Sequence, residues 1–122
     1  MSWKLNSDRP IYAQIIEEIQ RRIISGEYSA GQRMPSVREL AAQAEVNPNT
    51  MQKALAEMEQ KGLLYSQRTS GRFVTEDQEM IEEIKKSLAK EQIIAFVENM
   101  RQLGFNNEDI LAQVQKIVKE EE

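Results

Sequence analysis

The first part of the chain changes from an alternating to a helical pattern of apolar residues. Residues 2–9 alternate between apolar and polar side chains, which predicts a short extended arm. Isoleucines then recur at intervals of three and four, the spacing of one helix face. This pattern predicts a helix from Pro10 to Ser25, with Pro10 in its first position and Gly26 just beyond its end. The residues of this face are Ile11, Ile15, Ile16, Ile19 and Ile23.

Two shorter helices are predicted next, joined by a turn of about three residues. The first begins at Ser36, whose hydroxyl accepts a hydrogen bond from the Glu39 amide while the Glu39 carboxylate reaches back to the Ser36 amide. The second is capped by Asn47, carries Pro48 in its first turn and stops before Gly62. Its predicted inner face consists of Met51, Ala54, Leu55 and Met58.

An alternating segment, Leu63 to Val74, follows these helices and is interrupted by residues 69–71. This pattern predicts a β-hairpin with a flexible tip. Residues 32–34, just before Pro35, are predicted to form a short additional strand. Two short helices joined by a tight turn and followed by a hairpin are typical of a winged helix-turn-helix. We therefore predict such a domain over residues 1–75.

The remaining segment, residues 76–122, predicts two further helices. Residues 75–77 supply caps for a long helix, and Asn106 or Asn107 caps the last one. Two helices of this size cannot bury their apolar stripes alone, so we expect a second copy of the chain to cover them. Packing onto the first domain is the alternative. The predicted fold is thus mostly α (α+β), with a two-helix dimerisation tail. The predicted dimerisation residues are Ile84, Leu88, Phe96, Met100, Leu103, Ile110, Val114 and Ile117.

Composition narrows the class of protein. The 122 residues are 40% hydrophobic and 30% charged, close to an ordinary globular domain, and include no Cys and no His. Disulfides, thiolate or imidazole metal ligands, thiol nucleophiles and His-based triads are therefore excluded. The acidic pairs Glu17-Glu18 and Glu82-Glu83 are adjacent within predicted helices, so their carboxylates point apart and form no catalytic dyad. We expect no enzyme activity, no cofactor and no metal site.

The lengths of the apolar runs and the distribution of charge indicate the cellular compartment and the kind of binding partner. The first residues lack the apolar core of a signal peptide, and no apolar run approaches about 18 residues. We therefore expect a soluble cytoplasmic protein that does not bind membranes. The net charge of −4 is unevenly placed, because residues 1–75 carry ten Lys or Arg against eight Asp or Glu, and residues 76–122 carry six against twelve. This division fits a polyanion-binding domain joined to a part that does not touch the polyanion.

The outer face of the second short helix offers groups that read DNA. Asn49, Gln52 and Lys53 lie opposite its predicted buried residues. Asn and Gln side chains pair with adenine edges in the major groove, and Lys reaches guanine or phosphate. The amides at the helix start and the Thr50 hydroxyl suit phosphate oxygens. An ordinary solvated helix face is the alternative interpretation.

Arg38 is a second candidate for DNA contact. It lies in the first turn of a predicted helix, where a cation opposes the helix dipole. Helix stability therefore gives no reason for this residue, whereas a contact with a phosphate or a base edge does. The alternative is a surface ion pair with Glu39 or Glu45.

Two arginines, Arg68 and Arg72, flank the tip of the predicted hairpin. They enclose Thr69, Ser70 and Gly71, and a small tip between two cations suits a minor groove or the phosphates beside it. Solubility and protection of the hairpin edge by charge are the alternative.

Three segments of the chain resemble the GntR family of bacterial transcription regulators. They are Pro-Ser-Val-Arg-Glu-Leu-Ala at 35–41, Val-Asn-Pro-Asn-Thr-Met-Gln-Lys-Ala-Leu at 46–55 and Glu-Gln-Lys-Gly-Leu at 59–63. Three further features are similar to the YtrA-type subfamily. They are Arg-Pro-Ile-Tyr-Ala-Gln-Ile at 9–15, the short tail, and the Asn-Pro-Asn-Thr start of the second short helix, which corresponds to the recognition helix of the family.

The resemblance implies a homodimer that binds double-stranded DNA at a pseudo-palindromic operator, with half-sites about 34–36 Å apart. It also implies repression, in this subfamily often of the regulator's own operon with ABC transporter genes. The positions that contact DNA in the family correspond here to Arg38, Asn47, Asn49, Thr50 and Gln52.

The chain departs from the family pattern in three places. Many relatives have arginine where this chain has Pro48 and Gln52, so we expect a different base preference. Thr69 replaces the first glycine of the usual Gly-x-Gly wing tip. Because only residues 76–122 follow the hairpin, a deep effector pocket within one subunit is not expected. A small-molecule effector, which the sequence does not identify, is possible at the dimer interface or between the two parts of the chain. Gln92, which interrupts the apolar stripe, either marks such a site or, as is more common, is a solvated edge or sets the register by a hydrogen bond. A protein-interaction module is the competing class, and it predicts no steep salt dependence of DNA affinity.

Overall fold

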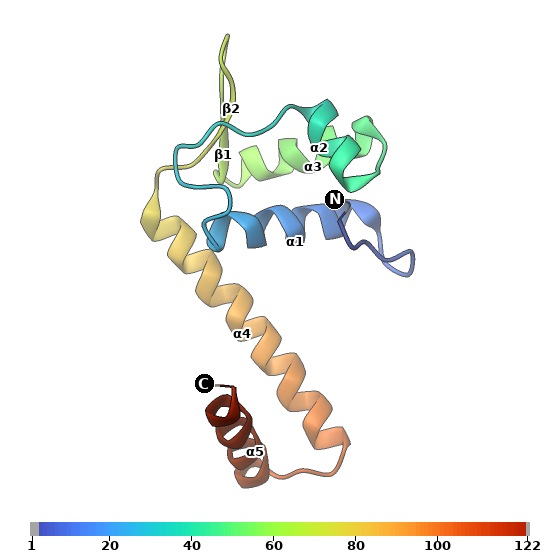
Figure 1. The fold of residues 1–122 in the computed structure, drawn as a ribbon, viewed down its shortest axis with the longest axis vertical. Helices are drawn as coiled ribbons and strands as arrows, with labels where there is room; N and C mark the ends of the chain where they lie inside the picture. Colours follow the sequence, from blue (N-terminus) through green and yellow to red (C-terminus); the bar gives the residue numbers. More distant parts are fainter. Residues whose placement is uncertain (1–2, 122) are drawn as a thin grey trace. The chain divides into compact units, whose positions relative to one another are not determined.

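The computed structural model describes residues 3–121, so Ser2 of the predicted arm and the terminal residues Met1 and Glu122 lie outside the described residues. Within these residues the predicted elements occur in the predicted order, as helices and one two-stranded antiparallel sheet (Figure 1). The mostly helical, winged fold is therefore confirmed. The elements are α1 (Ile11–Ile24), α2 (Val37–Ala44), α3 (Pro48–Gln60), β1 (Leu64–Gln67), β2 (Gly71–Val74), α4 (Gln78–Gln102) and α5 (Asn107–Glu120).

The chain divides into two compact units, and the division falls inside α4, between Ile84 and Lys85. We call the first unit, residues 3–84, the head and the second, residues 85–121, the tail. The head continues past the hairpin because Met80, Ile81 and Ile84, at the start of α4, pack against its core. The sequence analysis places the domain boundary at residue 75 because the hairpin ends there, whereas the compact unit extends to Ile84.

The core of the head lies between its helices. Figure 1 shows α1 and α3 side by side, and the two helices are in contact. The isoleucine face of α1 is buried apart from the half-buried Ile11, and the predicted inner face of α3 is buried throughout. Removing these faces from water is the main stabilising contribution to the head. Fully enclosed side chains include Ile15, Ile19, Leu40, Met51, Leu55 and Met58.

Pro10 stands one position outside its predicted place. It is the N-cap of α1, with φ −54° and ψ 128°, and its carbonyl accepts a hydrogen bond from the Gln14 amide at 3.3 Å. The proline ring fixes φ, but the extended ψ means that helical geometry begins only at Ile11. At the other end, Gly26 follows the C-cap Ser25 with φ 86°, a left-handed conformation that glycine adopts freely, as predicted.

The helix caps around the turn between α2 and α3 are confirmed. Ser36 and Glu39 form the reciprocal capping box at the start of α2, with both hydrogen bonds at 3.1 Å. The Asn47 side chain caps α3 by accepting from the Asn49 amide at 2.7 Å, and Pro48 lies in the first turn. These local bonds determine where each helix begins.

Glu45 ends α2 in a left-handed conformation, with φ 57° and ψ 47°, which no other described non-glycine residue adopts. This conformation costs an L-residue about 1–2 kcal/mol, whereas glycine adopts it freely. We expect Glu45→Gly to raise the free energy of unfolding by about 0.5–1 kcal/mol, because the freedom of glycine in the unfolded chain offsets part of the gain. Urea unfolding measures this change.

Gln43→Gly is the matched control for that variant. It places a glycine on the exposed side of α2, where the backbone is helical. Glycine inside a helix is unfavourable, so this control should lose about 0.5–1 kcal/mol. Similar losses in the two variants would mean that relief of strain at Glu45 does not contribute.

The hairpin forms as predicted, with residues 68–70 at its tip outside the two strands. The rings of Tyr65 and Phe73 stack across the strands, with centroids 5.7 Å apart. Leu64 and Val74, at the base, are buried in the core of the head. The register pairs Leu64 with Val74, Tyr65 with Phe73, Ser66 with Arg72 and Gln67 with Gly71.

The predicted strand at residues 32–34 is wrong in extent. The segment pairs with β2 at a single bridge, Arg33 to Phe73. The next amide in line to donate to β2 is that of Ser36, and it donates instead to the Glu39 carboxylate in the capping box, so the ladder does not continue. The bridge nevertheless places Arg33 beside the hairpin.

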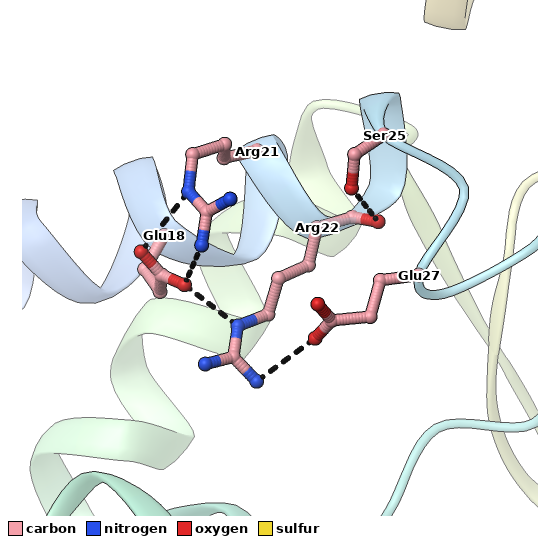
Figure 2. A network of polar contacts seen from close by, with 5 residues as sticks. All are labelled: Glu18, Arg21, Arg22, Ser25 and Glu27. Atoms are coloured by element: carbon pink, nitrogen blue, oxygen red, sulfur yellow. Dashed lines mark hydrogen bonds and ion pairs between the residues drawn. The ribbon is translucent and has the colours of Figure 1, made fainter. Parts of the chain in front are cut away.

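A polar cluster on α1 holds the N-terminal arm. Figure 2 shows Glu18 between the guanidinium groups of Arg21 and Arg22, at 2.5 and 2.7 Å, and Glu27 at 3.1 Å from Arg22. The Arg22 guanidinium also lies 4.5 Å from the ring centre of the buried Trp3, a cation–π distance. Partial burial raises the pKa of Glu18, but the two arginines outweigh it and lower that pKa below its ordinary value. The arm is thereby docked on α1.

The caps of the last two helices also agree with the sequence. The Asp77 carboxylate accepts from the Met80 amide at 3.1 Å, and Asn106 caps α5 by accepting from the Asp109 amide at 2.9 Å. Among residues 85–121, Ile110 is the one buried hydrophobic side chain, at 5% exposure. The large apolar side chains that remain exposed in the tail are Ile93, Ile94, Phe96, Leu103, Leu111, Val114, Ile117 and Val118.

The predicted dimerisation residues differ in exposure. Ile84 is half-buried against the core of the head, and Ile110 is buried within its own chain at 5% exposure. The apolar stripe of a helix is wide enough for some of its residues to pack against their own chain while others face solvent. Helical periodicity does not show which residues of the stripe do which. The others are half-buried at Leu88 and Met100 and exposed at Phe96, Leu103, Val114 and Ile117.

Candidate nucleic-acid interface

The exposed face of α3 lies where the sequence predicts it. Core residues hold one side of the helix in the head, which leaves the opposite side in solvent. Thr50 is half-buried at the edge of this face. The first two turns of α3 therefore present a continuous polar surface. Its exposed members are Asn47, Pro48, Asn49, Gln52 and Lys53.

The amide side chains on this face differ in how many of their hydrogen-bonding groups remain free. The Asn47 side-chain oxygen accepts from the Asn49 amide, so its NH₂ group remains for an external acceptor. In the described part of the chain, the carboxamides of Asn49 and Gln52 are exposed and show no hydrogen bond within the protein. These two groups retain the donor and acceptor pair that an adenine edge requires.

Lys53 is held by residues that the sequence analysis missed. Its ammonium group lies 5.0 Å from the ring centre of Tyr12 on α1. The Tyr12 hydroxyl donates to the Glu57 carboxylate on α3, which raises the pKa of the hydroxyl, and Lys61 lies 3.5 Å from the same carboxylate. In the sequence, Tyr12 lies at the edge of the isoleucine face of α1, but this position alone does not indicate that it contacts Lys53 and Glu57.

Arg38 is exposed on the first turn of α2. Neither Glu39 nor Glu45 forms an ion pair with it within the part of the chain that the structure describes. The Glu39 carboxylate instead accepts from the Ser36 amide, and this hydrogen bond lowers the pKa of Glu39. The capping of α2 thus leaves the Arg38 guanidinium available to an external anion.

A groove of about 800 Å³ runs between the start of α2 and the hairpin. Arg33, Arg68 and Arg72 line it, so three arginines border one concave surface. Guanidinium groups suit the oxygens of a sugar-phosphate backbone. The sequence analysis missed Arg33, because only the bridge to the hairpin brings it there. The hairpin residues of the groove also include Thr69, Ser70 and Gly71.

Gly71 is required where the hairpin meets Arg33. Its φ of 108° is a conformation that other residues rarely adopt. A Cβ atom at this position would lie 3.1 Å from the Arg33 Nε. The second glycine of the family's wing pattern therefore has a structural reason in this chain.

The two arginines beside the hairpin tip differ in their surroundings. Arg68 is exposed at the tip. The Arg72 Nε lies 2.5 Å from the Glu59 carboxylate on α3, and its side chain is 18% exposed. Partial burial raises the pKa of Glu59, but hydrogen bonds from Ser66 and Arg72 outweigh it and lower that pKa. Arg72 therefore lies against α3 instead of standing out from the hairpin.

Residues 3–121 show neither a metal site nor a membrane-spanning helix. No cluster of three His, Cys, Asp or Glu side chains that could hold a metal ion occurs among them. None of the helices in that range has the length and apolar character needed to cross a membrane.

Two short helices with a tight turn, a polar outer face on the second helix and a cationic hairpin define a DNA-binding protein of the winged helix-turn-helix class. A comparison with protein families then specifies the group within this class. Residues 11–74 match the profile described as bacterial regulatory proteins, gntR family. The chain belongs to the GntR family, as the resemblance predicted.

Two relatives from Bacillus subtilis (strain 168) extend over most of the chain. The uncharacterized HTH-type transcriptional regulator YhcF is 40% identical over 111 residues, covering 91% of this chain and 92% of YhcF. The HTH-type transcriptional repressor YtrA is 32% identical over 112 residues, covering 91% of this chain and 86% of YtrA. The YtrA-type resemblance is confirmed, and the protein is a transcriptional regulator, not an enzyme.

Solved structures agree with this fold. A GntR family transcriptional regulator from Listeria monocytogenes superposes with a TM-score of 0.85 at 42% identity, covering 92% of this chain and 98% of that one. The DNA-binding domain of AraR, solved in complex with operator ORX1, superposes with a TM-score of 0.53 at 36% identity, covering 62% of this chain and 92% of that one. Residues 11–74 are accordingly the GntR DNA-binding domain.

Proposed function

We propose that the protein is a homodimeric repressor that binds a pseudo-palindromic operator in double-stranded DNA. The observation that carries this proposal is the polar face of α3, with the unpaired amides of Asn49 and Gln52, beside a groove lined by arginines. Operator binding by the AraR domain and the repressor activity in the name of YtrA support it. Following the YtrA-type pattern, its targets are its own operon and the ABC transporter genes within it.

In this proposal, α3 enters the major groove. Asn49 and Gln52 read base edges, with Lys53 reaching a guanine or a phosphate. Arg38 and the Thr50 hydroxyl bind the phosphates beside these bases, together with the NH₂ group of Asn47. Pro48 takes no polar part, so the base preference depends on the two amides.

The groove between α2 and the hairpin receives the neighbouring backbone. Arg33 and Arg68 supply positive charge to its phosphates, with the small tip of Thr69, Ser70 and Gly71 against the minor groove. Arg33 is an addition to the residues predicted from sequence.

A second copy of the chain covers the tail in this proposal. The exposed apolar side chains of the tail range from 38% exposure at Val114 to 72% at Leu103, and so many in a short segment favour an interface. A pseudo-palindromic operator requires two heads related by a two-fold axis, which a tail-to-tail homodimer supplies. Ile93, Ile94 and Leu111, which are not among the predicted dimerisation residues, are also exposed in the tail.

A DNA titration at several salt concentrations tests the proposal. The probe is the duplex upstream of the protein's own gene, compared with a scrambled duplex of equal length. We expect a preference of about 10³ or more, with a steep loss of affinity as salt rises, because each neutralised phosphate releases counterions. Equal and weak binding to both, with a shallow salt dependence, would favour a protein-interaction module instead.

A further inference from the structure

Glu59 joins the recognition helix to both strands of the hairpin. Its Oε1 atom accepts from the Arg72 Nε at 2.5 Å and from the Ser66 hydroxyl at 2.6 Å. Ser66 and Arg72 are paired directly across β1 and β2. One carboxylate oxygen of α3 therefore holds one complete rung of the hairpin.

This rung lies between the anchored base of the hairpin and its tip. At the base, Leu64 and Val74 are 1% and 0% exposed and belong to the core of the head. Two positions further out, the side chains of Glu59 and Arg72 are 29% and 18% exposed, so their contact is partly shielded from water. Beyond the rung, the next pair is Gln67 with Gly71, and the tip follows. The direction of the tip relative to α3 thus depends on the bond to Glu59.

We propose that Glu59 is a positioning residue for DNA binding. It holds the wing, which consists of β1, β2 and the tip between them, at the angle where Arg68 reaches the DNA backbone while α3 occupies the major groove. This inference rests on the proposed function. The sequence analysis places Arg72 among the DNA contacts. In this inference, Arg72 instead belongs with Glu59 and Ser66 to the contact that fixes the wing, which we call the strut. Arg33 and Arg68 are then the arginines of the groove that meet phosphate.

The sign of the effect distinguishes positioning from simple charge. Glu59 is negatively charged in a domain proposed to bind DNA, and it forms an ion pair with Arg72, which would otherwise be available to a phosphate. Replacing it with a neutral residue reduces repulsion and releases Arg72, so charge alone predicts tighter DNA binding. Loss of positioning predicts weaker binding.

The test uses Glu59→Gln in the full chain, with the duplex that the wild-type protein enriches most from a random-sequence pool as the probe. We expect affinity to fall about tenfold, which is about threefold for each of the two heads of the proposed dimer. Arg68→Ala should cost about tenfold in the wild-type protein but at most about twofold in Glu59→Gln, since the tip is already displaced. Ser66→Ala, which removes one bond and leaves all charges, should cost about threefold.

Glu18→Gln is the matched control. It also neutralises a partly buried carboxylate paired with arginines, but on α1. We expect its DNA affinity to stay within about twofold of the wild type. Affinity of Glu59→Gln equal to or tighter than that of the wild type, or full additivity with Arg68→Ala, overturns the proposal.

Amide hydrogen exchange in the free protein separates the strut from the proposed function. In Glu59→Gln, the amides of β1 and β2 should exchange at least about tenfold faster than in the wild type, with α1 unchanged. Unchanged exchange in the strands refutes the strut. If the wild type enriches no duplex, the proposed function fails, whereas faster exchange still supports Glu59 as the residue that holds the wing.

Discussion

Arg38→Ala is expected to weaken operator binding by at least about 100-fold, the largest effect of any single substitution in the head. Arg38 is exposed, its helix is capped by other residues, and no described carboxylate pairs with it. A charge-assisted hydrogen bond from an arginine to a phosphate contributes about 1.5–3 kcal/mol, and the proposed dimer loses it in both heads. Fluorescence anisotropy with the operator duplex measures the change, and the slope of affinity against salt should fall by about two for two lost phosphate contacts.

The same variant should fold normally. A cation in the first turn opposes the helix dipole, so alanine leaves the free energy of unfolding unchanged or raises it by a few tenths of a kcal/mol, on the order of 0.3. Arg21→Ala is the matched control, since Arg21 is also an exposed arginine but lies on α1. Its DNA affinity should stay within about threefold of the wild type. A change within about twofold for Arg38→Ala as well would show that our assignment of Arg38 is wrong.

Met100→Glu is expected to convert the proposed dimer into a monomer. Met100 is half-buried on α4, on the same side as the exposed Phe96 and Leu103. An unpaired carboxylate in an apolar interface costs several kcal/mol, and two-fold symmetry places it there twice. Light scattering should give the single-chain mass of 14.1 kDa instead of twice that value. Operator affinity should fall at least about 100-fold, because each half-site is then bound independently.

Gln102→Glu provides the comparison for this substitution. It introduces the same charge in the same turn of α4, but Gln102 is an exposed polar residue on another side of the helix. This variant should keep the mass and the operator affinity of the wild type. An unchanged mass for Met100→Glu would rule out this face of α4 as the interface.

Features that depend on neighbouring residues were predictable from sequence. The capping box of Ser36 and Glu39 and the Asn47 cap each depend on side chains within three positions, so composition and spacing suffice. The inner face of α3 followed from helical periodicity, and its outer face followed as the complement. Pro10 was misplaced by one residue, because its ring restricts φ while the helix start also requires a helical ψ.

Contacts between distant residues were not predictable. Tyr12 and Glu57 are 45 positions apart, and Glu59 and Arg72 are 13 apart, so no local pattern links them. Arg68 and Arg72 look equivalent in the sequence, since both flank the hairpin tip. Only the register of the strands and the path of α3 show that Arg72 has a carboxylate partner and that Arg68 is exposed.

The attachments of α3 separate the positions that hold the helix in the head from the positions that a substitution can change at little cost. The core holds one side of the helix, Tyr12 and the wing hold its carboxylates, and Asn49, Gln52 and Ala56 remain exposed. Substitutions at such exposed positions usually change stability by about 0.5 kcal/mol or less. After gene duplication, a copy of this regulator could therefore acquire a new operator sequence through these positions without first acquiring compensating mutations elsewhere in the head.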